Sequence, residues 1–265
     1  MYAHHQETIG KIRDVFAGRD DVLAVLLGGS VAHGFCTESS DVDIMIIVSG
    51  EEYGRRRDAD QLLYFDTTIP TYEGGYVDGK YISIDFMRKV GEKGSEPARF
   101  AFQDARIILS RMEGLPALLA DIARYPAEGK AMRMARFYAQ LEAWHWYTGE
   151  AKRHDNGYLF NLAVSKLILF GGRLILAHNE MLYPYHKWFL RVLGDAPDKP
   201  EGLMGLIDGL LKDPAKEKID AFFTCVKDFR QWVGDDISFG ASWGQFFMYD
   251  SELNWLTGHT PVDDL

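Results

Sequence analysis

Residues 22–48 decide the fold, and they read VLAVLLGGSVAHGFCTESSDVDIMIIV. An apolar run of strand length begins this stretch at residues 22–27, and a second one ends it at residues 42–48. Each run is rich in Val, Ile or Leu and closes near a glycine, which is typical of a buried strand that stops at a turn. The stretch therefore predicts two buried strands joined by a short polar segment.

Residues that can carry chemistry lie where the predicted strands meet this polar segment. Gly28 and Gly29 allow the backbone to turn tightly and to approach a ligand closely, and Ser30 adds a hydroxyl donor. Asp41 and Asp43 are two residues apart on a strand, so their carboxylates project to the same side. Hard oxygen ligands in octahedral geometry suit Mg²⁺. The pair therefore predicts a magnesium site.

A third carboxylate is expected from residues 73–86. This segment predicts a strand, a turn and a second strand, because Asp78-Gly79 is a pair that favours the positive φ angles of a tight hairpin. In the second arm, apolar residues alternate with polar ones, which puts Asp85 on the face opposite the apolar side chains. We therefore expect Asp85 to join the other two carboxylates at the metal.

The rest of the chain separates into two parts. Tyr-Pro-Ala-Glu-Gly at residues 125–129 is the best candidate linker, so we place one domain at 1–125 and a helical domain at 126–265. Periodicity predicts helices near 5–17 and 115–124, a strand at 106–110, helices near 130–152, 157–179, 185–193, 201–212 and 215–233, and a Gly-rich aromatic tail from 234. The predicted fold class is α+β, a small mixed sheet with flanking helices followed by a helical bundle.

Composition and charge exclude several classes of protein. The chain has 265 residues, of which 47% are hydrophobic and 26% charged, as in ordinary globular proteins. A net charge of -10 would repel a phosphate backbone, so we expect no nucleic-acid partner. Cys36 and Cys225 stand far apart, which favours a reducing, cytoplasmic environment without disulfides or structural zinc. The longest continuous apolar runs are shorter than the roughly 20 residues that cross a bilayer, so no membrane association is expected.

The complete motif resembles that of the nucleotidyltransferase superfamily typified by DNA polymerase β. The signature of that superfamily is a hydrophobic residue, Gly, Gly or Ser, a spacer, and then Asp-hydrophobic-Asp-hydrophobic. It is met from Leu27-Gly28-Gly29-Ser30 to Asp41-Val42-Asp43-Ile44, and Ile84-Asp85-Phe86 fits the third, more distant carboxylate. The resemblance covers about residues 22–110. The helical half resembles more loosely the bacterial aminoglycoside and other small-molecule nucleotidyltransferases.

The resemblance implies an enzyme that transfers a nucleoside monophosphate from a nucleoside triphosphate and releases pyrophosphate. The expected reaction moves AMP from ATP to a hydroxyl of a small molecule such as an aminoglycoside antibiotic, and the acidic surface would suit a polycation. Mg²⁺ would bridge the triphosphate and the carboxylates. The catalytic and metal-binding residues would be Asp41, Asp43 and Asp85, and the nucleotide-binding residues would be Gly28, Gly29, Ser30 and Lys187.

The general base and the phosphate-binding cation would come in part from the helical domain. Asp85 takes the acceptor's proton directly, or it is a metal ligand while Glu142 or Glu150 is the base. Lys187 is the preferred cation because it stands among aromatic residues in a short segment between helices. We expect the helical domain to face the carboxylates across a groove.

Other functions stay open from the sequence. An antitoxin-like regulatory module that modifies or sequesters a protein partner, or a non-catalytic nucleotide-binding relative, would carry a similar motif. Arg173 and His178 also fit the Arg-x4-His spacing of helical ribonuclease domains, although five residues put them about 140° apart around a helix. The sequence does not set the acceptor, the preferred nucleotide or the oligomeric state.

Overall fold

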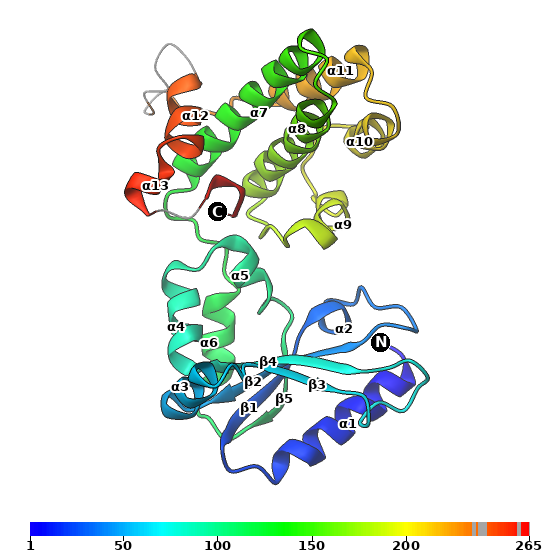
Figure 1. Ribbon diagram of the computed structural model, residues 1–265, viewed down its shortest axis with the longest axis vertical. Coiled ribbons are helices and arrows are strands. Elements are labelled where there is room, and N and C mark those ends of the chain that lie inside the picture. Colours follow the sequence, from blue (N-terminus) through cyan, green and yellow to red (C-terminus); the bar gives the residue numbers. More distant parts are fainter. Residues whose placement is uncertain (235–236, 238–242, 259–260, 265) are drawn as a thin grey trace. The chain divides into compact units, whose positions relative to one another are not determined.

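The structure is a computed structural model that describes residues 1–234, 237, 243–258 and 261–264 (Figure 1). The chain divides into two compact units, Met1–Arg124 and Tyr125–Leu265. The first unit is built on a mixed sheet with helices, and the described part of the second unit is helical. The fold class predicted from the sequence is therefore confirmed.

The sheet of the first unit has five strands in the order β3-β4-β2-β1-β5. The strands are β1 (Val22–Leu27), β2 (Val42–Val48), β3 (Leu63–Asp66), β4 (Val77–Ser83) and β5 (Arg106–Ser110). β1 is antiparallel to β2 and β5, β3 is antiparallel to β4, and β2 is parallel to β4. The central strand β2 thus has β1 on one side and β4 on the other.

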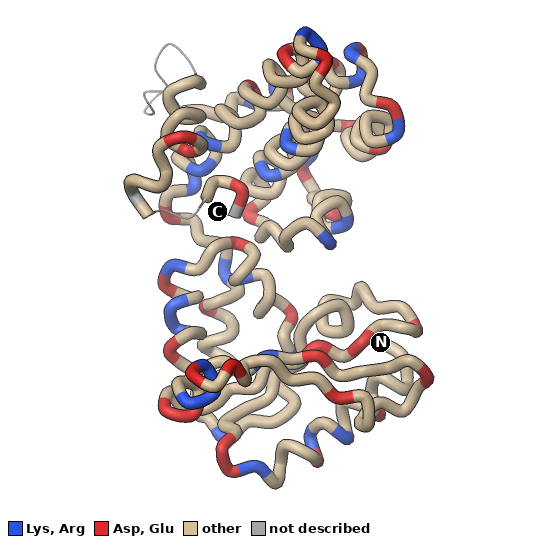
Figure 2. The backbone as a smooth tube through the Cα atoms, viewed as in Figure 1, with Lys and Arg blue, Asp and Glu red and all other residues tan. Residues whose placement is uncertain are grey.

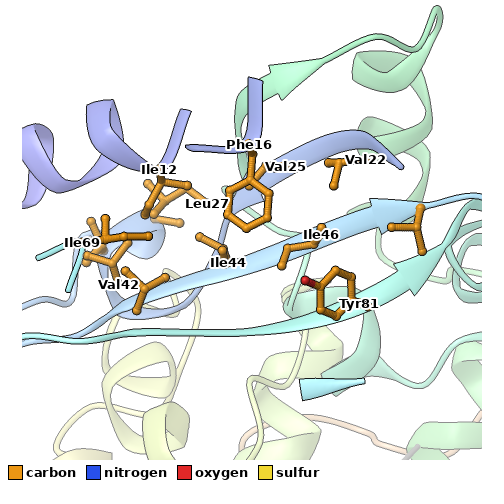
Figure 3. Packing of buried hydrophobic residues seen from close by; sticks show 14 residues of the cluster. Ile12, Phe16, Val22, Val25, Leu27, Val42, Ile44, Ile46, Ile69 and Tyr81 are labelled. Carbon is orange, nitrogen blue, oxygen red and sulfur yellow. The ribbon is translucent and has the colours of Figure 1, made fainter. Parts of the chain in front are cut away.

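One face of the sheet is covered by α1 (Ala3–Ala17). Ile12 and Phe16 are four residues apart on this helix, so their side chains project together. Both are fully buried and pack in one cluster with Ile44 and Ile46, which alternate along β2 (Figure 3). Because full burial of such a side chain stabilises the fold by roughly 1.5–3 kcal/mol, this layer holds α1 firmly against the sheet.

The opposite face is covered only in part. Met45 and Ile47 of β2 are buried there in a cluster with residues of α4 (Ile84–Lys93) and α6 (Leu115–Ile122). Side chains alternate along a strand, so Asp41 and Asp43 project to the same face as Met45. Both aspartates are only partly buried, because the apolar cluster does not extend to the start of β2. This part of the face is available for a site.

Three short or polar helices complete the described part of the first unit: α2 (Gly29–His33), α3 (Gly50–Asp58) and α5 (Glu96–Phe100). Acidic and basic positions are interleaved along α3 and α4 (Figure 2). In α3, Glu52 pairs with Arg55 and Arg56 at 2.7 and 2.6 Å. Charges on these helices are therefore compensated locally and do not form a single-sign patch.

The second unit contains α7 (Lys130–Arg153), α8 (Gly157–His178), η1 (His186–Trp188), α9 (Phe189–Gly194), α10 (Leu203–Lys212), α11 (Lys216–Lys227), α12 (Gly244–Ser251), α13 (Asn254–Thr257) and η2 (Val262–Asp264). α8 has the length and the hydropathy of a membrane span, and 67% of its most apolar window is buried inside the unit. Glycines let other elements approach it closely, since a Cβ on Gly172 would lie 2.3 Å from the ring of Phe189. α8 is thus the core helix of this unit.

Most predicted elements are confirmed, but the hairpin predicted at 73–86 is wrong. Val77–Ser83 form one continuous strand, and α4 begins at Ile84. Gly79 lies inside β4, where a Cβ would be 2.7 Å from a side-chain carbon of Ile44 and 2.9 Å from its carbonyl oxygen. The glycine therefore permits the close approach of two strands and does not form a turn.

Boundaries and short elements account for the remaining differences. α3, β3 and α5 are not predicted from the sequence, because they are short or mostly polar. The helix predicted near 215–233 ends at Lys227. The tail predicted from 234 lies partly outside the described residues.

Candidate active site

Three carboxylates gather near the start of β2 and β4. In the parallel register of these strands Asp43 lies beside Asp78, and Asp41 precedes Asp43 by two residues on the same face. One carboxylate oxygen from each of the three residues lies within 4.8 Å of the others. Asp41 and Asp43 are half-buried, whereas Asp78 is exposed. The three side chains are therefore close enough to share a divalent cation.

The chemistry of this acid cluster, Asp41, Asp43 and Asp78, fits Mg²⁺. All of its ligand atoms are hard carboxylate oxygens, and among the described residues no His or Cys belongs to the group. Negative charges this close repel one another, and a bound divalent cation would offset that repulsion. The residues present thus fit the metal that the sequence predicts.

The glycine segment after β1 packs directly against Asp43. The backbone N–H of Gly28 donates to the carbonyl oxygen of Asp43 at 2.9 Å. Gly29 has a φ of +58°, and a Cβ at this position would lie 1.7 Å from Oδ2 of Asp43. Ser30 follows in the first turn of α2 and is buried. Glycine is therefore required at position 29 both for its backbone angle and for the space that the carboxylate occupies.

Two tyrosines border Asp41. The charge of Asp41 raises the pKa of Tyr76, and partial loss of hydration and a hydrogen bond to Asp41 add to this effect. Burial, followed by the charge of Asp41, raises the pKa of Tyr72, whose hydroxyl donates to the carbonyl oxygen of Ser40 at 2.6 Å. Nε2 of His5 lies 3.0 Å from the same carbonyl oxygen. These contacts hold the backbone that leads into Asp41.

Asp85 does not join the acid cluster, which corrects the prediction that it is the third catalytic and metal-binding carboxylate. Ser83 ends β4 and caps α4 by accepting a hydrogen bond from the N–H of Phe86 at 3.1 Å, so Asp85 lies in the first helical turn. Its side chain is 73% exposed and lies 3.5 Å from Arg88. The five steps of strand from Asp78 to Ser83 alone span roughly 16 Å, too far for a shared metal.

The other two candidate bases have partners inside the second unit. Glu142 accepts a hydrogen bond from the hydroxyl of Tyr138 at 2.7 Å and lies 3.6 Å from Nζ of Lys227. Glu150 pairs with Arg153. Both glutamates of α7 are therefore paired with neighbouring side chains, and these pairs account for them without contact to a substrate.

The remaining candidates of the helical half do not all gather in one place. Nζ of Lys187 lies 5.2 Å from the ring centroid of Trp188, and its contact with a nucleotide stays a prediction. Trp146 lines a cavity of about 580 Å³ within the second unit, together with His145 and Asp220, which are 3.0 Å apart. Lys187 does not line this cavity.

Arg173 and His178 have different surroundings, although both belong to α8. Arg173 is fully buried, with its guanidinium 4.4 Å from the ring centroid of Phe137 and 4.2 Å from that of Tyr183. His178 instead hydrogen-bonds to Asp198. The ribonuclease-type spacing therefore reflects a core arginine and a separate histidine near the helix end.

The candidate site residues that the sequence does not predict are Asp78 and Tyr76. The sequence predicts a turn at Asp78 because Asp-Gly is a strong hairpin signal. The seven residues from Val77 to Ser83 also read as one strand, and that reading would have placed Asp78 beside Asp43. No local signal in the sequence marks Tyr76.

One comparison with known proteins, the match to a family model, covers this arrangement. Residues 9–93 match the family model described as a nucleotidyltransferase domain, a range that holds Gly28–Ser30 and the whole acid cluster. Among solved structures, the chain is similar to a nucleotidyltransferase-like protein from Exiguobacterium sibiricum 255-15, with 15% identity, 92% of this chain and 78% of that chain covered, and a TM-score of 0.48. A search of curated proteins found no match. Residues 9–93 therefore match a nucleotidyltransferase domain, which supports a nucleotidyltransferase activity of the chain.

Proposed function

We propose that this nucleotidyltransferase moves a nucleoside monophosphate, with AMP from ATP as the first candidate, onto a hydroxyl of a small molecule. The observation that carries the proposal is the juxtaposition of the acid cluster with Gly28–Ser30 at the uncovered start of β2. The match of residues 9–93 supports transfer of a nucleoside monophosphate in general. The match does not distinguish one acceptor or one nucleobase from another.

Each residue of the site has a distinct role in this proposal. Asp41, Asp43 and Asp78 hold Mg²⁺, which when bound neutralises and orients the triphosphate. The backbone N–H of Gly29 and the hydroxyl of Ser30 hold the β- and γ-phosphates, and Gly28 lets the backbone approach them closely. Asp78, the most exposed of the three acids, accepts the proton of the acceptor hydroxyl. The oxygen of that hydroxyl attacks the α-phosphorus, and pyrophosphate leaves on the opposite side.

An aminoglycoside-type antibiotic is the acceptor class that the net charge favours. A charge of -10 attracts a polycation to the surface of the whole molecule. Such attraction raises the rate of encounter more than it selects a particular ligand. The residues next to the acid cluster act on the acceptor at contact distance, so they select the acceptor more strongly than the net charge does.

Transfer of label from ATP tests the proposed function. The full chain is incubated with ATP labelled at the α-phosphate, Mg²⁺, and a panel of aminoglycosides, other hydroxylated metabolites and a cell lysate. We expect label on a small molecule, released pyrophosphate in equal amount, and neither product with the Asp43→Asn variant.

Two other outcomes would contradict the proposal. Label on a protein alone would indicate an antitoxin-like module that modifies a partner. Nucleotide binding without any label transfer would indicate a non-catalytic relative.

A further inference from the structure

An exposed apolar surface borders the acid cluster on the β3 edge of the sheet. In the antiparallel register of β3 and β4, Phe65 lies opposite Asp78 and Leu63 lies opposite Lys80. Opposite residues of an antiparallel pair share a face, so Leu63 and Phe65 project to the same side as the acid cluster. They are 82% and 66% exposed, which is unusual for large apolar side chains on a strand.

Tyr76 connects this surface to the acid cluster. Its ring centroid lies 5.4 Å from that of Phe65, and its carbonyl oxygen accepts a hydrogen bond at 3.1 Å from the N–H of Val42, the residue between Asp41 and Asp43. The apolar side chains of β3 and the metal-binding carboxylates are therefore parts of one continuous surface.

Lys80 adds a positive charge to the same surface. It follows Asp78 by two residues on β4, is exposed, and within the described ranges forms no ion pair. Arg88, at the start of the next helix, has Asp85 as its partner. Lys80 is thus a cation on the same face as the acid cluster that is available to a ligand.

We propose that Leu63, Phe65, Tyr76 and Lys80, the acceptor surface, bind the acceptor of the reaction, a hydroxylated molecule with an apolar ring and an anionic group. The inference rests on the proposed function and narrows its acceptor. Phe65 and Leu63 would cover the apolar ring, and Lys80 would pair with a carboxylate or phosphate of the acceptor.

The order of the strands supports this choice of occupant. Gly28–Ser30, which hold the phosphates in the proposed function, lie on the β1 side of β2, whereas β4 and β3 lie on its other side. In-line displacement requires the incoming hydroxyl to approach opposite the leaving pyrophosphate. The acceptor therefore lies over β4 and β3, where Asp78 can take its proton.

Charge complementarity makes the prediction specific. With most of the charge of the acid cluster offset by Mg²⁺, Lys80 at contact distance favours an anionic group of the acceptor over an ammonium group. An aminoglycoside would also leave Leu63 and Phe65 largely uncovered by apolar atoms. The local surface thus favours an amphipathic anion over the polycation that the net charge suggests.

A fluorescent amphipathic anion, 1-anilinonaphthalene-8-sulfonate, is a direct probe of the acceptor surface in the full chain. We expect one binding site per chain and a dissociation constant raised about tenfold by Lys80→Met or Phe65→Ser, which is the size expected for losing one charged or one aromatic contact. Lys89→Met, which removes an exposed lysine of α4, should change nothing. Equal affinity in all variants would overturn the proposal.

The labelled-ATP assay separates the acceptor surface from the nucleotide site. Lys80→Met should raise the KM of an anionic aromatic alcohol about tenfold and leave the KM of its uncharged amide and of ATP unchanged. A raised KM for ATP alone would assign Lys80 to the nucleotide and overturn the proposal. Probe binding with the expected variant pattern but no transfer to any compound would contradict the proposed function and leave the surface as a ligand site.

A second copy of the chain is the competing occupant, because β3 is an edge strand. If Phe65 served self-association, the wild type would dimerise with rising concentration and Phe65→Ser would be monomeric. That result would overturn the acceptor role. We expect sedimentation to give the same mass for both proteins.

Discussion

At the scale of single residues, the site depends on a glycine as much as on its acids. Gly29 has a left-handed backbone conformation, and the side chain of Asp43 occupies the position that a Cβ would take. We expect Gly29→Ala to displace this carboxylate, to weaken Mn²⁺ binding more than tenfold, and to cost about 1–3 kcal/mol of unfolding free energy. Mn²⁺ titration and chemical denaturation measure the two effects. Wild-type metal affinity in this variant would show that the Gly29–Asp43 contact is dispensable.

Asp43 itself should be needed for activity but not for folding. Asp43→Asn removes a metal-binding charge without opening a cavity, and it relieves repulsion within the acid cluster. We therefore expect transfer to be lost while the melting temperature of the metal-free protein stays equal or rises. Turnover close to that of the wild type would refute the role of Asp43 at the metal.

The residues of the site differ in how far a sequence can reveal them. Asp41 and Asp43 lie together because a spacing of two on one strand fixes their common face, and this needs no knowledge of the fold. Asp78 reaches Asp43 only through the parallel register of two strands that are distant in sequence. Asp85 fits the spacing equally well, but a helix begins one residue before it.

At the scale of elements, the close pairing of β2 and β4 positions the third carboxylate. Gly79 allows this pairing, since a Cβ would meet both the side chain and the carbonyl oxygen of Ile44. We expect Gly79→Ala to destabilise the first unit by about 1–3 kcal/mol, as overpacking does elsewhere. Gly10→Ala is a matched control, because a Cβ there meets nothing and should stabilise α1 by about 1 kcal/mol. Equal stability of the two variants would contradict this account of β4.

The elements predicted correctly are those with a strong local pattern. Buried apolar strands such as β1 and long helices such as α7 and α8 have a pattern of apolar residues that fits few other secondary structures. The sequence does not predict β4 correctly, because Asp78-Gly79 is typical of a turn and the residue that requires Gly79, Ile44, lies on another strand. β3 has only four residues and is recognised through its pairing with β4.

At the scale of the whole molecule, the first unit has its own buried core. Two apolar clusters, one on each face of the sheet, consist entirely of residues before Arg124. We expect a chain ending at residue 124 to unfold in one cooperative transition and to bind Mn²⁺ within about twofold of the full chain, because all three carboxylates are retained. Transfer should fall at least tenfold if the helical half covers the nucleotide, as the sequence predicts. Full transferase activity of the short chain would assign the helical half another purpose.

We propose that Asp41, Asp43 and Asp78, without Asp85, hold the metal for nucleotidyl transfer. The most direct test measures Mn²⁺ affinity and AMP transfer in two matched variants, Asp78→Asn and Asp85→Asn. Each removes one exposed carboxylate of the same unit. We predict that Asp78→Asn weakens Mn²⁺ binding and lowers transfer at least a hundredfold, because it removes a metal ligand and the proposed base, while Asp85→Asn keeps both within about twofold. Loss of both properties in Asp85→Asn, with an active Asp78→Asn, would contradict the account.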